Sequence, residues 1–334
     1  MHPIRPAIVV ICLSVVSTIA SAETLSEILN HVATRCRAYS TIDCKWKVES
    51  KFEESFAKQR NADPFGDDVA AVDSKQQFPA TIMWMGSFQS DESKLRLSYN
   101  WPVWFFPERR LRLRPRIVVS DGTEARSLDT YDSHSQSIWT KSQNPVNVGF
   151  DHHLIPLLTQ FRAYQYPIAS LFPPEAKDVK IDHEVWDGHE CLVLRRSSSG
   201  GSREFTVWLD PESDYSVRRY TSTRAGVIEH DIRIQLTKRD GFWIPEQWQW
   251  FDYWNASGEL CAVHSAVLLE ISVNQPINDA LFELSFPRGT TVSDQRVVPN
   301  RELLIGSGGR EFEITTRQLA KAGSSEALLK ELDK

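Results

Sequence analysis

Apolar and polar residues alternate over several stretches in the first half of the chain, and a period of two is the pattern of a β-strand with one buried face. Ile42, Cys44, Trp46 and Val48 alternate with charged residues in the first such stretch. The pattern returns in four later segments: ATIMWMGSF, KLRLSYNW, RLRLRPRIVVSDG and SQSIWTK. We therefore expect the first half to consist mainly of neighbouring strands.

The second half predicts a longer series of strands separated by tight turns. Three hairpins are expected around Asp187-Gly188, Asp210-Pro211 and Asp240-Gly241, because Asp followed by Gly or Pro is typical of turns. A last long strand over residues 258–273 is apolar on both faces. No crossover helices separate these strands in the pattern, so they should pair as antiparallel neighbours.

Two helices interrupt the strand pattern. Residues 24–39 carry apolar side chains at helical spacing after Thr24 and Glu27, which together form a capping box. A shorter helix is expected over residues 150–164, with its leucines and one phenylalanine on one side. The fold class predicted is therefore mainly β (α+β), with an N-terminal helix and an inserted helix lying on the sheet.

The first 22 residues have the layout of a secretory signal peptide. Arg5 gives a basic start, residues 7–16 are apolar, and Ala20-Ser21-Ala22 offers a small-residue cleavage site after Ala22. An uncleaved membrane anchor is the alternative, but the apolar run is shorter than the roughly 20 residues that span a bilayer. We expect a periplasmic or otherwise exported protein with no transmembrane segment after cleavage.

The remaining chain divides into a main domain and a tail. Residues 23–296 hold the strand and helix patterns, and residues 53–78 interrupt them as a polar, acidic surface loop. Residues 297–334 contain glycines and a short helical pattern, which is typical of a linker with one or two small tail helices. We expect one large folded domain followed by this tail.

Charge and cysteine content exclude some classes of function. The chain of 334 residues has 38 basic and 44 acidic side chains, and an acidic balance gives no indication of nucleic-acid binding. Four cysteines follow the signal, without a C-x-x-C or zinc-like spacing, so they could be buried thiols or form disulfides. These cysteines are Cys36, Cys44, Cys191 and Cys261. We expect no cofactor.

Histidines near one predicted hairpin could suggest a metal site. His183-Glu184 and His189-Glu190 flank the turn at Asp187-Gly188, whereas a zinc protease carries both histidines on one helix. Polar residues of a hairpin that face solvent are the simpler interpretation, and we expect no metal there.

Tryptophan is abundant, with 11 residues mostly in predicted strands. Ordinary core packing and cross-strand pairing will explain several of these rings. A β-domain with few helices cannot easily bury all of them, however, and ligand pockets favour aromatic linings. We therefore predict an aromatic cavity. The strand tryptophans assigned to it are Trp46, Trp84, Trp208, Trp248 and Trp250.

The segment WPVWFFPERRLRLRPR combines large rings with arginines. Prolines at 102 and 107 make a regular central strand improbable, so we expect an irregular apolar loop at the mouth of the cavity. Arginines then alternate with leucines and form one basic face, where guanidinium groups could meet anionic head groups. A solvated strand face below a buried loop is the alternative. The mouth residues are Trp101, Trp104, Phe105, Phe106, Arg112 and Arg114.

The end of the main domain, VNQPINDALFELSFPRGTTVSD, resembles the closing segment of the periplasmic lipoprotein carrier superfamily (LolA/LolB-like). FTVWLDPESDYSVRRY is also similar to the central hairpin of that family. The resemblance implies a strongly curved antiparallel sheet, an incomplete β-barrel with helices covering its concave side and an apolar cavity for acyl chains. The closing residues that match are Asn274, Pro276, Asp279, Phe282, Phe286, Pro287 and Gly289, of which Phe282, Phe286, Pro287 and Gly289 would have a structural role.

These observations favour an exported, non-enzymatic binding protein. Its expected ligands are a lipid or the acyl chains of a lipoprotein, held in the aromatic cavity for trafficking in the bacterial envelope. The chain is longer than a simple carrier and lacks a lipobox cysteine, and the same fold also serves in sensors. The alternative is therefore an envelope stress sensor or scaffold that binds another protein. No nucleophile with a matching base stands out in the sequence, so an enzyme is not expected.

Overall fold

A computed structural model describes most of the chain after the predicted signal segment. The described residues are 23–61, 77–91, 93–105, 110–131, 134–141, 154–162, 168–198, 200–254 and 257–333. Residues 1–22, most of the predicted acidic loop and Phe106 lie outside these ranges. Among the described residues, no helix has both the length and the hydropathy needed to cross a bilayer.

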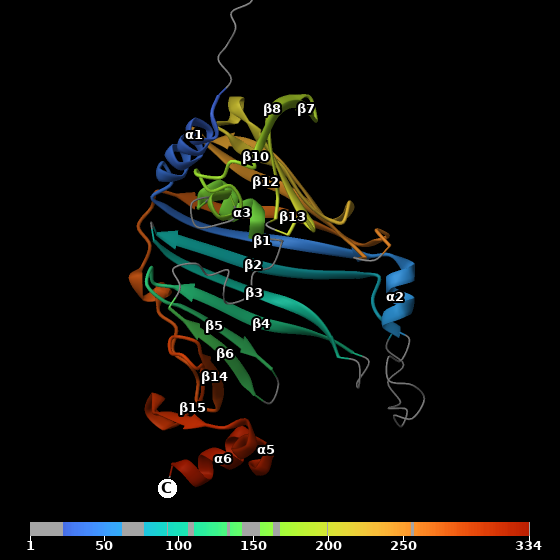
Figure 1. Ribbon diagram of the computed structural model, residues 1–334. Helices are drawn as coiled ribbons and strands as arrows, with labels where there is room; N and C mark the ends of the chain where they lie inside the picture. Colours follow the sequence, from blue (N-terminus) through green and yellow to red (C-terminus); the bar gives the residue numbers. More distant parts are fainter. Residues whose placement is uncertain are drawn as a thin grey trace, which may run out of the picture.

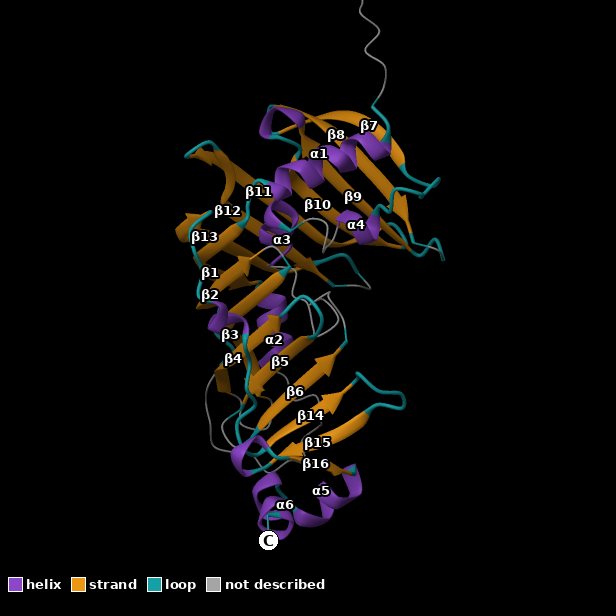
Figure 2. Ribbon diagram, turned by 90° about the vertical axis from the view of Figure 1, so that its left-hand side faces the viewer, coloured by secondary structure: helices purple, strands orange, loops and turns teal. Residues whose placement is uncertain are grey.

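One open, curved sheet organises the described part of the chain, and its sixteen strands form a single layer (Figures 1 and 2). The fold is mainly β, as the alternating pattern predicts, and the sheet does not close into a barrel. The first group of strands is β1 (Thr41–Phe52), β2 (Thr81–Asp91), β3 (Lys94–Phe105), β4 (Arg110–Ser120), β5 (Ala125–Thr130) and β6 (Ser135–Thr140).

The second group contains the three predicted hairpins and the long last strand of the domain. Its strands are β7 (Lys180–Trp186), β8 (His189–Ser197), β9 (Arg203–Asp210), β10 (Ser216–Arg224), β11 (Val227–Arg239), β12 (Phe242–Tyr253) and β13 (Leu260–Val273). Each group pairs in chain order, and β1 pairs with β13 to join the two groups. The meander predicted from the turn spacing is therefore present as two antiparallel arrays.

A parallel pair departs from the predicted all-antiparallel pattern. β14 (Thr290–Asp294) lies parallel to β6, whereas every other pairing between the described strands is antiparallel. The closing segment crosses the ends of β3 to β5 before it reaches β14, so the chain enters this strand in the same direction as β6. The sheet is consequently mixed.

Helices lie on the concave side of the second array (Figure 1). α1 (Leu25–Arg37) begins at the predicted capping box of Thr24 and Glu27, and α3 (Ile155–Phe161) matches the predicted short helix. The buried side chains of both helices belong to the same apolar core as the strands. Arg35 of α1 also donates to the carbonyl oxygen of Thr159, which ties the two helices together. The remaining short helix of this region is α4 (Ile168–Leu171).

The predicted surface loop at residues 53–78 begins as a helix. α2 (Glu54–Asn61) follows β1 and lies beyond the ends of β1 and β2 (Figure 1), and residues 62–76 lie outside the described residues. The apolar periodicity of α2 is weak. Of its described side chains, only Phe56 and Ala57 are half-buried and the others are exposed. The sequence therefore gives little helical signal for this segment.

The tail is a folded extension of the sheet and not only a linker with helices. Residues in it form β15 (Arg301–Ile305), β16 (Glu311–Ile314), α5 (Thr316–Ala322) and α6 (Ser325–Leu332). Leu304 and Ile314 of the strands are buried against Leu328 and Leu329 of α6. Each strand has only four or five residues, which is too short for the alternation to be visible in the sequence.

Near the centre of the sheet, a tryptophan ring packs directly against the backbone of the neighbouring strand. Trp46 of β1 is fully buried and lies over Gly86, its cross-strand partner in β2. A Cβ atom at position 86 would overlap the indole ring. The ring also contacts Trp248 of β12 with 6.5 Å between ring centroids. Glycine at position 86 is therefore required by the tryptophan beside it.

Asp294 at the end of β14 connects the tail to the main sheet. Its fully buried carboxylate accepts hydrogen bonds from Arg296 and Arg301, and Arg296 stacks on the ring of Trp139 in β6. The hydrogen bonds from Arg296, followed by those from Arg301, outweigh the effect of burial and hold the pKa of Asp294 well below its usual range.

The depressed pKa of Asp294 predicts a stability contribution that is lost in acid. The carboxylate stabilises the fold fully above about pH 4, the pKa of an unfolded aspartate, and less as the pH falls toward the folded pKa. We expect wild type to exceed Asp294→Asn in free energy of unfolding at pH 7, and the gap to narrow below pH 4. Urea titrations of both proteins between pH 3 and pH 7 measure this difference. A gap that stays constant across this range would contradict the assignment.

The segment around Trp101 is a regular strand, so the prediction of an irregular loop is wrong. β3 continues to Phe105 and pairs with β4, with Pro102 opposite Leu113. Between the described residues, the pairing of β2 with β3 stops at Gly86 and Tyr99. Pro102 therefore occupies a part of the strand that is paired on one side, where a missing N–H is tolerated as on an edge strand.

The four cysteines after the predicted signal are buried, free thiols, so the disulfides considered from the sequence do not form in this structure. Burial raises the pKa of the Cys44 thiol far above its usual value and raises that of Cys191 to about 11. Both thiols are consequently protonated and unreactive at neutral pH.

Candidate functional site

The best candidate for a binding site is an apolar chamber of about 510 Å³. It is formed where β1, β2, β3, β12 and β13 approach α2. The lining consists mainly of aromatic and aliphatic side chains, with a short polar section on β1, β12 and β13. The lining residues are Ser50, Phe52, Phe56, Phe78, Ile82, Trp84, Trp101, Pro102, Val103, Leu111, Asp252, Tyr253, Trp254, Cys261, Ala262 and His264.

A cluster of aromatic rings builds the wall nearest α2. Phe52 at the end of β1 stacks on Phe56 of α2 with 5.6 Å between ring centroids, and Phe78 meets both rings edge-on. Trp254 lies 5.5 Å from Phe56. Three parts of the chain, residues 52–56, Phe78 and Trp254, thus contribute one continuous aromatic surface.

Two tryptophans form a second wall on β2 and β3. Trp84 and Trp101 contact each other with 5.7 Å between ring centroids. Trp84 is almost fully buried and also touches Trp250 of β12, whereas Trp101 is half-exposed toward the chamber. These two rings line the same chamber as the phenylalanine cluster.

The polar section is a chain of hydrogen bonds across β2, β1, β13, β12 and β11. Trp84 Nε1 donates to Ser50 Oγ over 3.1 Å, and Ser50 Oγ lies 2.8 Å from His264 Nδ1. His264 Nε2 lies 3.1 Å from one oxygen of Asp252, and His230 Nδ1 lies 3.2 Å from the other. Because an ionised carboxylate can only accept, His264 Nε2 carries the proton that points to Asp252, and in this neutral tautomer Nδ1 accepts from the Ser50 hydroxyl.

A serine, a histidine and an aspartate linked by hydrogen bonds in this order would suggest nucleophilic catalysis. Ser50, however, is 0% exposed, and the His264 ring is stacked flat on Trp250 at 4.4 Å. With its side chain fully buried, the serine oxygen is closed to a substrate in this structure. The chain of hydrogen bonds therefore orients Asp252, whose carboxylate is partly exposed on the chamber wall.

The charge on Asp252 is maintained by its two histidine neighbours. Burial alone would raise the pKa of this carboxyl, but the hydrogen bonds from His230 and His264 outweigh it and hold the pKa well below the usual range. The chamber thus contains an ionised carboxylate at neutral pH.

Only part of the predicted cavity set lies in the chamber. Trp84 and Trp101 line it, while Trp46, Trp248 and Trp250 are buried in the core of the sheet behind it. The backbones of Trp104 and Phe105 belong to β3, and their side chains, like the whole of Phe106, lie outside the described residues.

Trp208 lies on the other face of the sheet. Val207 and Leu209 on either side of it enter the main core, and alternate residues of a strand face opposite sides. Trp208 instead packs with Trp186 and Cys191 in a separate cluster, and Arg219 stacks on its ring. Trp208 therefore does not line this chamber. Four of the five residues in the segment FTVWL are apolar, and they fall on both faces of the strand. The pattern therefore could not show which face Trp208 takes.

The predicted arginine face is on β4, beside the chamber. Arg114 is the cross-strand partner of Trp101, and Arg112 is that of Val103, so these arginines share a face with two residues that line the chamber. Arg114 pairs with Asp129 over 2.8 Å and stacks on Tyr131. Because one guanidinium is already paired and stacked, the segment is less basic toward the chamber than the sequence indicates.

Several chamber residues were not identifiable from the sequence. Phe56 and Phe78 lie within the segment 53–78 expected to be a surface loop, and Phe52 borders it. Asp252 and His264 lie in strands whose pattern is mainly apolar or aromatic. The one local signal is that Ser50 and His264 interrupt apolar faces of β1 and β13. Their juxtaposition depends on the β1–β13 pairing of Ser50 with His264, which no local pattern specifies.

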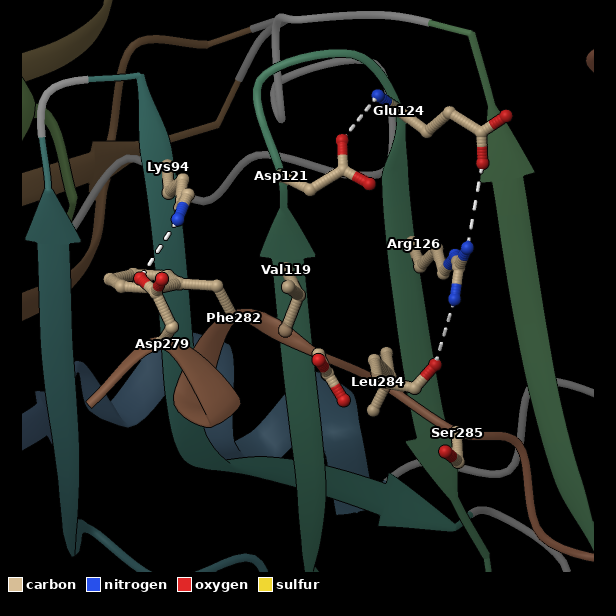
Figure 3. Close-up of a pocket in the computed structure, with 10 residues that line it drawn as sticks. Lys94, Val119, Asp121, Glu124, Arg126, Asp279, Phe282, Leu284 and Ser285 are labelled. Carbon is tan, nitrogen blue, oxygen red and sulfur yellow. Dashed lines mark hydrogen bonds and ion pairs between the residues drawn. The ribbon is translucent and has the colours of Figure 1, made fainter.

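A second hollow of about 390 Å³ lies under the closing segment (Figure 3). Phe282 and Leu284 are buried against Val119 and Leu128 of the sheet, and Lys94 forms an ion pair with Asp279 across the opening. Charged groups surround this hollow, and most of them are paired with each other. It is a consequence of the way the closing segment packs on the sheet.

The rest of the closing segment also packs against the sheet and its extension. Phe286 contacts Trp139 of β6 edge-on. After Pro287, Gly289 adopts a positive φ of 87° at the turn into β14, which favours glycine. Of the four residues assigned a structural role, Phe286, Pro287 and Gly289 thus lie where the closing segment meets β6 and β14, and Phe282 packs on β4 and β5.

His189, Asp210 and Glu212 are close enough to share a metal ion. Asp210 is already bonded to Ser213 and Arg218, however, and caps the turn at Glu212. Because an arginine neutralises the central carboxylate, this group is better explained as the turn between β9 and β10.

Comparisons with known proteins leave the family of the chain open. No family model and no curated protein matches the sequence. A solved structure of PNGF-II overlaps with 78% of this chain and 32% of its own chain, at 9% sequence identity and a TM-score of 0.24. The matched part is thus about a third of the length of PNGF-II, and a likeness of this size carries no argument about fold or function.

Proposed function

We propose that the protein binds an apolar, chain-like ligand, a lipid or the acyl chains of a lipoprotein, in the aromatic chamber. The observation that carries the proposal is the chamber itself: about 510 Å³ of space, bounded by seven aromatic rings, with a polar section at one side. Its size is in the range of small-molecule binding sites. An exported location, as the N-terminal segment predicts, would suit a role in envelope lipid or lipoprotein trafficking.

Burial of apolar surface would supply the binding energy. Removal of hydrocarbon surface from water is worth about 25 cal/mol per Å², and the partly exposed rings of Trp101 and Phe56 both offer apolar contact in the chamber. The walls are supported by the buried rings behind them, so the chamber is largely preformed. No chemical step is required of any chamber residue in this proposal.

Charged substitutions in the chamber are expected to abolish ligand load. Trp101→Asp and Phe56→Asp each place an ionised carboxylate where an acyl chain would lie, and its desolvation is costly. We expect lipid copurified from the native host, measured by mass spectrometry of an organic extract, to fall at least about tenfold.

Trp186→Asp is the matched control, because Trp186 is also a half-buried strand tryptophan but lies on the other face of the sheet. Its lipid load should remain that of wild type. Equal loads in all four folded proteins, or no lipid in wild type together with no tryptophan fluorescence response to added lipid, would rule out the chamber as a lipid site.

A second candidate, a sensor or scaffold that binds another protein, is favoured by the convex face. Met83, Met85, Val267 and Leu269 are exposed there, and Met85 and Val267 flank Lys47 in neighbouring strands. Apolar side chains grouped on a sheet face are typical of protein contacts. A Met85→Asp variant that loses a stable protein complex but keeps its lipid load would support this candidate instead.

A further inference from the structure

We propose that Asp252 makes the chamber selective for ligands with a cationic ammonium head group on an apolar tail. This inference rests on the proposed function and specifies the chemical class of the ligand. It concerns one carboxylate, its hydrogen bonds, and the rings that surround it.

The carboxylate of Asp252 retains the capacity to bind a ligand. Each of its oxygens accepts one hydrogen bond, from His230 and from His264, and an ionised carboxylate can accept about four. The side chain is 37% exposed and lines the chamber. The two histidines fix its orientation, so a cation can approach it without any rearrangement of the wall.

The cations nearest this carboxylate are its own partners His230 and His264, which carry a charge only when they are protonated. Among the described residues that line it, Asp252 is the one carboxylate, and no lysine or arginine is included. While these histidines are neutral, the carboxylate in this apolar site attracts a positive charge more strongly than it would in water, because the effective dielectric constant is lower. An anionic head group would be repelled for the same reason.

The aromatic walls favour the same charge. Phe52, Phe56, Trp101 and Trp254 all line the chamber with Asp252, and the faces of aromatic rings attract ammonium groups within about 6 Å. Carboxylate and rings together resemble the cages that hold quaternary ammonium groups. Alkyl carbons next to the nitrogen would remain in apolar contact.

The arginines of β4 do not reverse this preference. β4 is five strands away from β12 in the sheet, roughly 24 Å along its surface at the usual strand spacing. Arg114 and Arg116 both contact Asp129, and none of the described chamber-lining residues is an arginine. They flank the far side of the chamber, where the tail of a ligand bound at Asp252 would lie.

Three ligands with the same tail and different heads test the proposal. Decyltrimethylammonium, decyl maltoside and decyl sulfate are titrated into the mature protein below their micelle concentrations, at pH 7 and 0.15 M salt, and calorimetry gives each Kd. We expect the cation to bind about tenfold or more tighter than the neutral ligand, and the sulfate to bind weakest.

Asp252→Asn should remove this preference while it keeps the shape of the side chain. The Kd of the cation should approach that of the neutral ligand within about threefold, with the neutral Kd unchanged as the control for folding. Asp240→Asn, in the exposed turn at the other end of β12, removes the same charge from the protein and should keep the wild-type ratio.

Phe56→Leu provides a second variant that leaves the hydrogen bonds of Asp252 in place. It retains apolar contact but removes one ring face, so the preference for the cation should fall and the neutral ligand should still bind. If decyl maltoside binds wild type as tightly as the cation does, the selectivity proposal is wrong and the lipid-binding proposal stands. If none of the three ligands binds, both proposals fail.

Discussion

Replacement of Trp46 with alanine is expected to lower the free energy of unfolding by about 3–5 kcal/mol. The indole is fully buried on β1, the strand that joins the two arrays through β13. Its removal deletes contacts with the backbone of Gly86 and the ring of Trp248. The sheet on both sides is held by long ladders, so it cannot collapse into the space that is left. Urea unfolding followed by far-UV circular dichroism measures the loss.

The contact with Gly86 makes the two positions strongly coupled. Gly86→Ala alone is expected to cost about 1–3 kcal/mol, because its Cβ overlaps the ring. In the Trp46→Ala background the added methyl group enters the vacated space, so its cost should fall by at least about 0.5 kcal/mol. Gly200→Ala, where a Cβ meets no atom within 4 Å, is the control. Additive losses at positions 46 and 86 would contradict the packing described.

Arg218→Ala is expected to cost about 3–5 kcal/mol, because it leaves the buried carboxylate of Asp210 without its counter-ion. Arg218 Nε donates to Asp210 over 2.7 Å, and both side chains are nearly inaccessible to solvent. Ser213 bonds to both partners and completes the network at the β9–β10 turn. The free energy of unfolding in urea is again the measurement.

An exposed ion pair of equal length provides the comparison. Arg239 and Glu246 are also 2.7 Å apart, but both are well exposed, and pairs of this kind contribute at most about 1 kcal/mol. Arg239→Ala should therefore have little effect. Similar losses for Arg218→Ala and Arg239→Ala would show that burial does not set the energetics of the Asp210 turn.

Alternation and turn residues were sufficient to predict most strands of both arrays, but not β5 or the end of β3. The period of two in β1 and the Asp-Gly turns at 187 and 240 act locally, so a short window of sequence contains all that determines them. The capping box of α1 is local in the same way. These elements could be predicted because neighbours in sequence decide their conformation.

Pairing across the sheet could not be predicted in the same way. The position of Pro102 in β3 depends on where β2 stops pairing with it, and the parallel contact of β14 with β6 depends on the path of the closing segment. Short strands such as β15 and β16 carry too few residues for a period to be visible. Each of these features is set by partners that are remote in the chain.

The sequence led us to expect an aromatic cavity, but only some of the residues assigned to it line the chamber. The excess of tryptophan indicated an aromatic cavity, and Trp84 and Trp101 do line the chamber. Trp208 does not line it, and its segment, apolar on both faces, could not show this. Asp252, the residue on which the ligand selectivity rests, gives no signal in sequence, since its role depends on histidines from two neighbouring strands.

The seam between β1 and β13 constrains the order in which the sheet can be built. Lys45 and Glu270 pair across it although they are 225 residues apart, so most of the chain must be made before β1 acquires its partner on that side. Closure of so large a loop is slow, while each hairpin array can form early from local turns. A newly made chain therefore presents two open sheet edges at β1 and β12 until β13 arrives between them, and open edges are where chains join one another. Correct assembly consequently depends on delivery of β13 to these edges before a second molecule reaches them.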